Sequence, residues 1–182
     1  AQSNLGYYYH SGEGVEQSYK KALYWWQKAA KQGHADSQYN LGITYGKGYG
    51  VEQSYKKAIY WWQKAAEQGH AEAQFNLGVT HEKGYSVEQS YEKAIHWYTK
   101  AAEQGFVKAQ NNLGAIYYHG YGVEQSYPRA VYWFTKAAEK GFTESQYNLG
   151  IAYEKGYGVE KSDEKAVYWW QKAAEQGHAE AQ

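Results

Sequence analysis

The sequence contains no cysteine and no methionine, has a single proline and carries no net charge. The absence of cysteine excludes disulfide bridges and thiolate zinc sites. Nineteen Lys and Arg residues balance nineteen Asp and Glu residues, so the chain lacks the basic excess typical of nucleic-acid-binding proteins. No apolar run approaches the roughly 18 residues that a membrane-spanning helix needs. We therefore expect no nucleic-acid partner and no insertion into a membrane. The chain starts at Ala1 rather than at a methionine, so we expect it to be a piece of a longer protein.

Aromatic residues and glycine are abundant instead. Aromatic side chains make up 19% of the chain, with 22 Tyr and 8 Trp, so large rings can supply much of a core. Twenty glycines against one proline predict turns closed by glycine between helices.

One stretch organises the whole chain, because the sequence from Val15 to Ala30 recurs with few changes four more times. The copies start at Val51, Val87, Val123 and Val159, an interval of 36 residues each time. A fixed period of this length predicts a solenoid, in which each unit packs on its neighbours. We expect a single array over residues 1–182, with units at 1–36, 37–72, 73–108, 109–144 and 145–180, and with Ala181 and Gln182 starting a sixth.

The second unit shows the pattern of the first helix in each repeat. Gln38, Leu41 and Tyr45 recur at helical spacing. Gly42 falls inside this helix at a cost of about 1 kcal/mol relative to Ala, and it returns in every unit. Its recurrence predicts that the next helix approaches closely at this level. Gly48 is expected to end the helix in a left-handed conformation.

A second helix follows in each unit. Ser54 is its expected N-cap, and a serine recurs at this position in all five units. Ala58 and Trp62 belong to an apolar stripe, so Trp62 is predicted to lie in the core and Trp61, on another side, to pack on the neighbouring unit. Pro128 falls in the first turn of one such helix, where proline is tolerated.

The repeated motif resembles a known family. A-x-A-Q-x-N-L-G-x-x-Y-x-x-G-x-G-V is followed by Y-x-K-A-x-x-W-[YFW]-x-K-A-A-x-Q-G, and together they resemble the Sel1-like repeat over the whole chain. The clearest copy runs through residues 71–78 and 91–98, and the departures include Ser86 in place of the second loop glycine and His81 in place of tyrosine. The resemblance implies an all-α fold, an α/α right-handed superhelical solenoid of five 36-residue helix-turn-helix repeats that scaffolds protein complexes. It also implies a secreted or periplasmic location for a bacterial member, whereas the sequence itself fixes no compartment.

Two patterns suggest chemistry but are better explained by structure. Ser18 to Lys21 reads S-x-x-K, as in penicillin-recognising enzymes, yet it recurs in three further units, whereas a catalytic serine occurs once. His34, His70 and His178 share one position, at which the other two units have phenylalanine, so a packing ring explains them better than a metal ligand. We expect no enzyme activity, no metal and no cofactor.

An asparagine in the middle of the first helix recurs without an obvious structural need, because Asn is disfavoured there. The recurring residues, which we call the asparagine ladder, are Asn4, Asn40, Asn76, Asn112 and Asn148. In related superhelices the first helices line the concave groove. Each amide offers a donor and an acceptor, which suits the backbone of an extended peptide. Hydrogen bonding to a neighbouring helix or loop is the alternative, and both roles can coexist.

Other positions on the same helix face differ between units, and partner specificity could reside there. We expect apolar contacts from Tyr39, Phe75, Tyr118 and Tyr147. The remaining predicted groove residues are Ile43, Val79, Lys47, Lys83 and Glu82. The predicted function is a non-enzymatic scaffold that binds a peptide or protein segment in this groove. The alternatives are binding or hydrolysis of β-lactams or cell-wall amides, as the resemblance to cysteine-rich family members implies, and a structural array that associates end to end through its uncapped terminal repeats.

Overall fold

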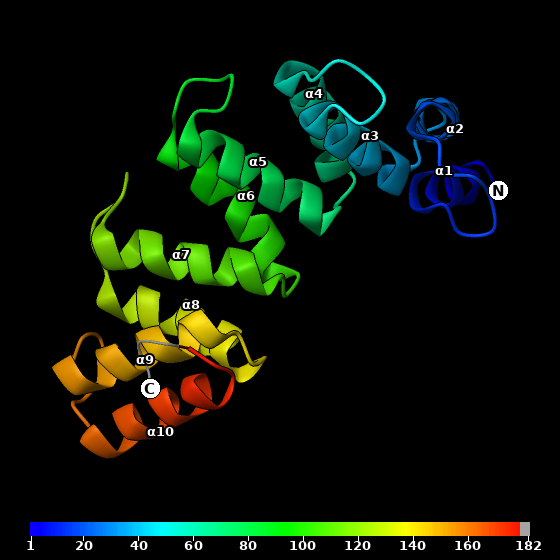
Figure 1. Cartoon of the computed structure of the whole chain (residues 1–182). Coiled ribbons are helices and arrows are strands. Elements are labelled where there is room, and N and C mark those ends of the chain that lie inside the picture. Colours follow the sequence, from blue (N-terminus) through cyan, green and yellow to red (C-terminus); the bar gives the residue numbers. More distant parts are fainter. Residues whose placement is uncertain (179–182) are drawn as a thin grey trace. The chain divides into compact units, whose positions relative to one another are not determined.

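The structure is a computed structural model and describes residues 1–178. Over this range the chain forms ten α-helices and no strand (Figure 1). In chain order they are α1 (Gln2–Ser11), α2 (Tyr19–Lys31), α3 (Ala35–Lys47), α4 (Tyr55–Glu67), α5 (Ala71–Lys83), α6 (Tyr91–Glu103), α7 (Val107–His119), α8 (Tyr127–Glu139), α9 (Thr143–Lys155) and α10 (Asp163–Glu175). The predicted all-α fold of five helix–turn–helix repeats is confirmed. Ala181 and Gln182, the predicted start of a sixth unit, lie outside the described residues.

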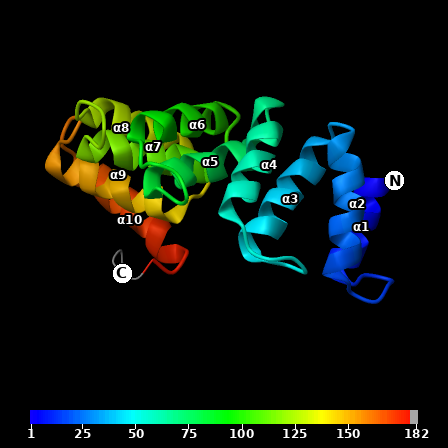
Figure 2. The same ribbon diagram turned by 90° about the horizontal axis from the view of Figure 1, so that it is seen from above.

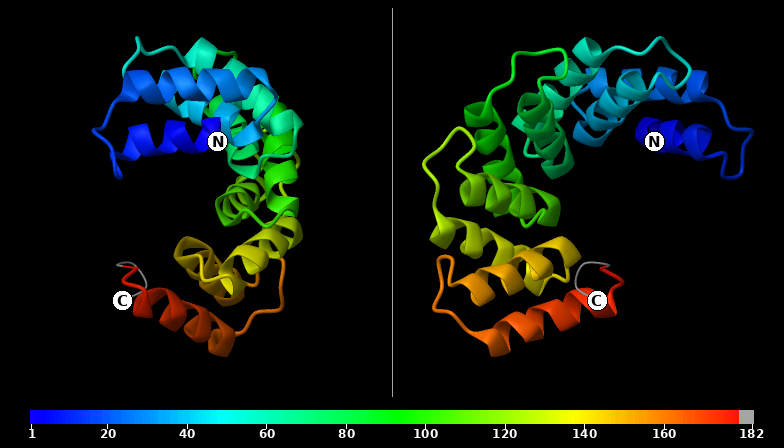
Figure 3. Two further views of the ribbon diagram at one scale, coloured as in Figure 1. Left: turned by 90° about the vertical axis from the view of Figure 1, so that its right-hand side faces the viewer. Right: turned by 60° about the vertical axis from the view of Figure 1, so that its left-hand side comes forward.

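The chain divides into two compact units, Ala1–Gln89 and Ser90–Gln182. In the first unit α1 packs against α2 and α3 against α4, as Figure 2 shows for α1 and α2. The junctions between its repeats are the contacts of α2 with α3 and of α4 with α5. In the second unit α7 pairs with α8 and α9 with α10, the latter pair being clear in Figure 3. Its junctions are α6 with α7 and α8 with α9.

The predicted helix ends are largely confirmed. The Ser54 hydroxyl accepts a hydrogen bond of 3.3 Å from the backbone N–H of Lys57, and Ser18, Ser90 and Ser162 cap their helices in the same way. Ser126, which precedes the helix with Pro128 in its first turn, makes no such bond. Gly48 ends α3 with φ +74°, in the left-handed region where glycine has no steric penalty.

The recurring helix glycine allows an indole to lie directly on the first helix. A Cβ on Gly42 would overlap the pyrrole edge of the Trp62 ring, and Trp62 is only 8% exposed. The equivalent pairs are Gly6 with Trp26, Gly114 with Phe134 and Gly150 with Trp170. The predicted close approach is therefore confirmed, and the core position of Trp62 with it.

A buried glutamine joins each repeat to the one before it. Gln38, 4% exposed, donates from Nε2 to the carbonyl of Ala30 at 3.1 Å, near the end of α2, where carbonyls lack intrahelical partners. Its Oε1 accepts a 2.7 Å hydrogen bond from Gln68. The corresponding bonds to helix-end carbonyls are Gln74 to Ala66, Gln110 to Ala102 and Gln146 to Ala138. Sequence periodicity marks this residue as inward-facing but does not indicate that it serves the junction.

Candidate partner-binding face

The asparagine ladder lies midway along the first helices, and Asn40, Asn76, Asn112 and Asn148 are all half-buried. Asn76 hydrogen-bonds with the Tyr39 hydroxyl, so it has a contact with the preceding repeat. Burial, assisted by the charge of Glu72, raises the pKa of Tyr39, while the bond to Asn76 partly opposes this shift. The side-chain amides of the other three make no hydrogen bond within residues 1–178.

A cavity of about 300 Å³, here called the α3–α5 cavity, opens beside Asn76 in the first unit. It brings together four predicted groove residues, Ile43, Lys47, Asn76 and Val79. Its other lining residues are Gly46, Gln53, Tyr55, Trp62, Thr80 and Tyr85. These were not predicted as site residues. The sequence feature that could have indicated this cavity is Gly46, because every other unit has His, Glu or Tyr at that position.

The second unit has a smaller cavity, the α7–α9 cavity, at the equivalent place. Its volume is about 230 Å³. It is lined by Ala115, Tyr118, His119, Phe134, Asn148 and Ile151. Each of these residues lies 72 positions after a lining residue of the α3–α5 cavity, so the two cavities are the same structural feature in different repeats. Asn148 and Tyr118 are the predicted site residues found here.

The remaining predicted residues line neither cavity. Tyr39 stacks on His70 with ring centroids 4.6 Å apart, and Tyr147 stacks on His178 at 4.5 Å. These stacks confirm that the two histidines act as packing rings. Glu82 forms an ion pair of 2.7 Å with Lys83. Phe75 and Asn112 are half-buried on the same face of their helices.

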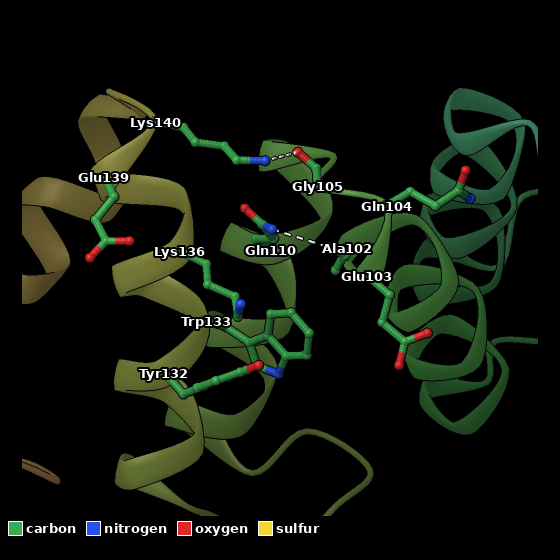
Figure 4. A pocket seen from close by; sticks show the side chains of 10 residues that line it. All are labelled: Ala102, Glu103, Gln104, Gly105, Gln110, Tyr132, Trp133, Lys136, Glu139 and Lys140. Carbon is green, nitrogen blue, oxygen red and sulfur yellow. Dashed lines mark hydrogen bonds between the residues drawn. The ribbon is translucent and has the colours of Figure 1, made fainter.

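A different, more polar type of pocket lies between successive second helices. One of about 470 Å³ involves α6 and α8, and one of about 460 Å³ involves α8 and α10. In the first, shown in Figure 4, Lys140 donates to the carbonyl of Gly105 at 2.9 Å, and the buried Oε1 of Gln110 has no hydrogen-bond partner. The counterpart Gln146 accepts from Gln176 at 2.8 Å. Lys140 stands where the other repeats have that glutamine, which explains the unpaired oxygen.

The patterns that suggested chemistry, the S-x-x-K motifs and the histidines, can be placed in the structure. The hydroxyls of four S-x-x-K serines accept hydrogen bonds as helix caps, which confirms their structural interpretation. Over residues 1–178 no three His, Asp or Glu side chains gather closely enough to hold a metal ion. No helix in this range has the length and apolar character to cross a membrane.

Five consecutive segments match the Sel1 repeat family, at residues 1–34, 35–70, 71–106, 107–142 and 143–178. From the second match on, each starts at the first residue of a first helix. No curated protein matches the chain.

Solved structures of Sel1 repeat proteins are similar over nearly the whole chain. The crystal structure of a Sel1 repeat protein from Oxalobacter formigenes is 38% identical, with a TM-score of 0.90 over 99% of this chain and 72% of that one. The protein c5321 of uropathogenic Escherichia coli, described as a protective antigen with an SLR fold, is 37% identical, with a TM-score of 0.97. The match covers 99% of this chain but only 38% of c5321. Cysteine-rich protein B of Helicobacter pylori is more distant, at 26% identity and a TM-score of 0.55 over 69% of this chain and 90% of that one.

Proposed function

Because the five matches span residues 1–178, this chain belongs to the Sel1 repeat family, and we propose that it binds an extended segment of a partner protein on its first-helix face. Sel1 repeat proteins generally mediate protein–protein interactions and are typically not enzymes. The proposal for this chain is narrower, because it names the face made by α3 and α5 in the first unit and by α7 and α9 in the second.

One observation carries the proposal. Two cavities lie between first helices of successive repeats, and each is lined by an asparagine of the ladder, Asn76 or Asn148. Val79 and Ile151 give the two cavities an apolar wall beside that amide. A peptide presents the same combination, with backbone donors and acceptors flanked by side chains that seek apolar contact.

The sequence left two roles open for the asparagines, binding a peptide backbone and hydrogen bonding within the scaffold. Both are compatible with these contacts. Asn76 is held by Tyr39 and still faces the α3–α5 cavity, so its amide would be oriented before a ligand arrives. Such preorganisation lowers the entropic cost of binding. Asn148 has no hydrogen-bonding side-chain partner among the described residues and lines the α7–α9 cavity.

The test is to select peptides that bind the wild-type chain from a random display library and to measure their affinity for variants by calorimetry. Replacing Asn76 with Ala should weaken binding about tenfold, the worth of one or two hydrogen bonds. The matched control is Tyr60→Ala, because Tyr60 lies on a second helix in the same unit and is 53% exposed. Equal affinity for Asn76→Ala and wild type, or a larger loss in Tyr60→Ala, would contradict the proposed face.

End-to-end association is a second candidate, favoured by a separate observation. Leu5 of α1 is 37% exposed, whereas its counterparts in the other four repeats are fully buried. A second copy of the chain, or a further repeat of a longer chain, would cover it. Light scattering on the wild type and on Leu5→Glu separates these two cases. End-to-end association is supported only if the wild type self-associates and Leu5→Glu does not.

A further inference from the structure

Two of the five repeats, the first and the fourth, hold an aromatic ring at the end of their first helix, in a slot bounded by other rings. His10, at the end of α1, lies against the rings of Tyr19, Trp26 and Tyr49 at centroid distances of 5.3, 5.4 and 5.7 Å. Tyr19 and Tyr49 stack on each other at 5.0 Å. We call the space bounded by these three rings the ring slot. Gln17 steadies it, donating from Nε2 to the His10 carbonyl and to the Tyr19 hydroxyl.

The fourth repeat repeats this arrangement with a phenol in place of the imidazole. Tyr118 lies against Tyr127 at 5.3 Å and Tyr157 at 6.1 Å, and those two rings stack at 4.5 Å. Gln125 again donates both to the carbonyl of the slot residue, at 2.7 Å, and to the neighbouring tyrosine hydroxyl, at 3.2 Å. Burial raises the pKa of Tyr118, as expected for a ring held in a partly dry slot.

In the second repeat the slot has no ring of its own. The residue equivalent to His10 is Gly46, and the walls Tyr55, Trp62 and Tyr85 line the α3–α5 cavity instead. Tyr55 and Tyr85 stand 5.9 Å apart, wider than the pairs of the filled slots. The Tyr55 hydroxyl also lacks the hydrogen bond from glutamine that both filled slots have, and this side chain is 41% exposed.

The same glycine leaves a cation uncompensated beside the slot. Lys83 and Lys155 each pair with the glutamate that precedes them, at 2.7 and 3.1 Å. Lys47 occupies the same position in its repeat but follows Gly46, is exposed, and has no ion pair within residues 1–178. The empty ring slot and the unpaired ammonium group of Lys47 therefore line the same cavity.

We infer that the empty ring slot of the second repeat receives an aromatic side chain from a partner protein, and that a carboxylate next to that side chain pairs with Lys47. The occupant's chemistry follows from the chain itself, since equivalent walls enclose an imidazole in one repeat and a phenol in another. Stacked and edge-on ring contacts favour an aromatic side chain over an aliphatic one of similar size. Charge complementarity at Lys47 selects an acidic neighbour. The inference rests on the proposed function and adds to it the kind of peptide that is bound.

The experiment uses an acetylated and amidated Gly-Tyr-Asp-Gly peptide, titrated into the isotopically labelled chain and followed by nuclear magnetic resonance. Replacing the peptide tyrosine with alanine should weaken binding at least about tenfold. Replacing its aspartate with asparagine should weaken binding about threefold, as for an exposed ion pair, and Lys47→Gln should abolish that difference.

Gly46→Tyr is the decisive variant, because it gives the second repeat the tyrosine that the fourth repeat has at the equivalent position, Tyr118. It should fold, fill its own slot and lose the tyrosine-dependent binding. Gly46→Ala is the matched control, since an added Cβ makes only ordinary contacts of 3.6 Å with Ala58 and Trp62, and it should keep most of the affinity. Tyrosine-dependent binding that survives Gly46→Tyr would overturn the inference.

Failure of the slot can be distinguished from failure of the proposed function. Library-selected peptides that lose affinity in Asn76→Ala but not in Gly46→Tyr would support the binding face and overturn the slot. Titration with p-cresol, the tyrosine side chain alone, tests the slot without any peptide backbone, and no binding to the wild type would count against it. If the wild type self-associates and Gly46→Tyr abolishes this, the occupant is a second copy and the assignment to a partner protein is wrong.

Discussion

Two glycines one turn apart in α3 should respond to the same substitution with opposite signs. At Gly46 an added methyl group contacts its nearest neighbours, Ala58 and Trp62, at 3.6 Å, which is ordinary van der Waals contact. The variant therefore gains the helix propensity of alanine, about 0.5–1 kcal/mol. At Gly42 the same methyl group would overlap the buried indole of Trp62.

The overlap at Gly42 cannot be relieved by a small adjustment, because the atoms in the way belong to a rigid ring. Overpacking of a core costs about 1–3 kcal/mol, and expelling an aromatic side chain altogether costs about 3–5 kcal/mol. Because the ring has to be displaced, we take the larger cost. After subtracting the gain in propensity, we expect Gly42→Ala to lower the free energy of unfolding by about 2–4 kcal/mol.

The assay is urea unfolding of both variants and the wild type, followed by far-UV circular dichroism. A double-mutant cycle with Trp62→Ala isolates the contact, because the cost of Gly42→Ala should largely disappear once the indole is gone. The reasoning is refuted if Gly42→Ala is as stable as Gly46→Ala, or if its cost persists in the Trp62→Ala background.

Three further changes test other features. Ser86 has φ +56°, where four other repeats have glycine, so Ser86→Gly should stabilise the chain by about 1 kcal/mol and raise its Tm by about 2–4 °C in a thermal melt. Lys140→Gln should raise the free energy of urea unfolding by about 1 kcal/mol by giving the buried Oε1 of Gln110 a donor, and a loss of stability would contradict that pairing. Burial lowers the pKa of His10 below its unfolded value of about 6.5, so the stability it contributes is complete above that pH and is lost as the pH falls through the lowered value. Unfolding measured from pH 7.5 to pH 5 should show this loss in the wild type and a smaller one in His10→Phe.

Periodicity was enough to predict the fold, because each local signal is repeated five times in the same context. The serine caps, the glycine at the end of α3 and the core indole of Trp62 all depend on residues close in sequence, and they were confirmed. The capping bond absent at Ser126 shows that the residue type alone does not guarantee the geometry.

The candidate site was only partly predictable, for a physical reason. Sequence spacing assigns residues to a helix face but does not show whether a ring on that face is free or already packed. Tyr118, for example, was predicted to contact a ligand, and it lines the α7–α9 cavity while also packing against Tyr127 and Tyr157 of its own chain. Gly46 was not predicted as a site residue, because a glycine offers no side chain to bind a ligand, yet it lines the α3–α5 cavity.

The glutamine at each repeat junction makes the repeats interchangeable. Removing residues 35–70 would bring Gln74 to the place of Gln38, so the hydrogen bond to the carbonyl of Ala30 could form again at the new junction. The array should therefore tolerate loss or gain of whole repeats most readily where both flanking repeats keep this glutamine. A deletion of residues 35–70 would also remove Gly46 and Lys47, and with them the proposed ring slot. The number of repeats can therefore change without loss of binding only if the second repeat is kept.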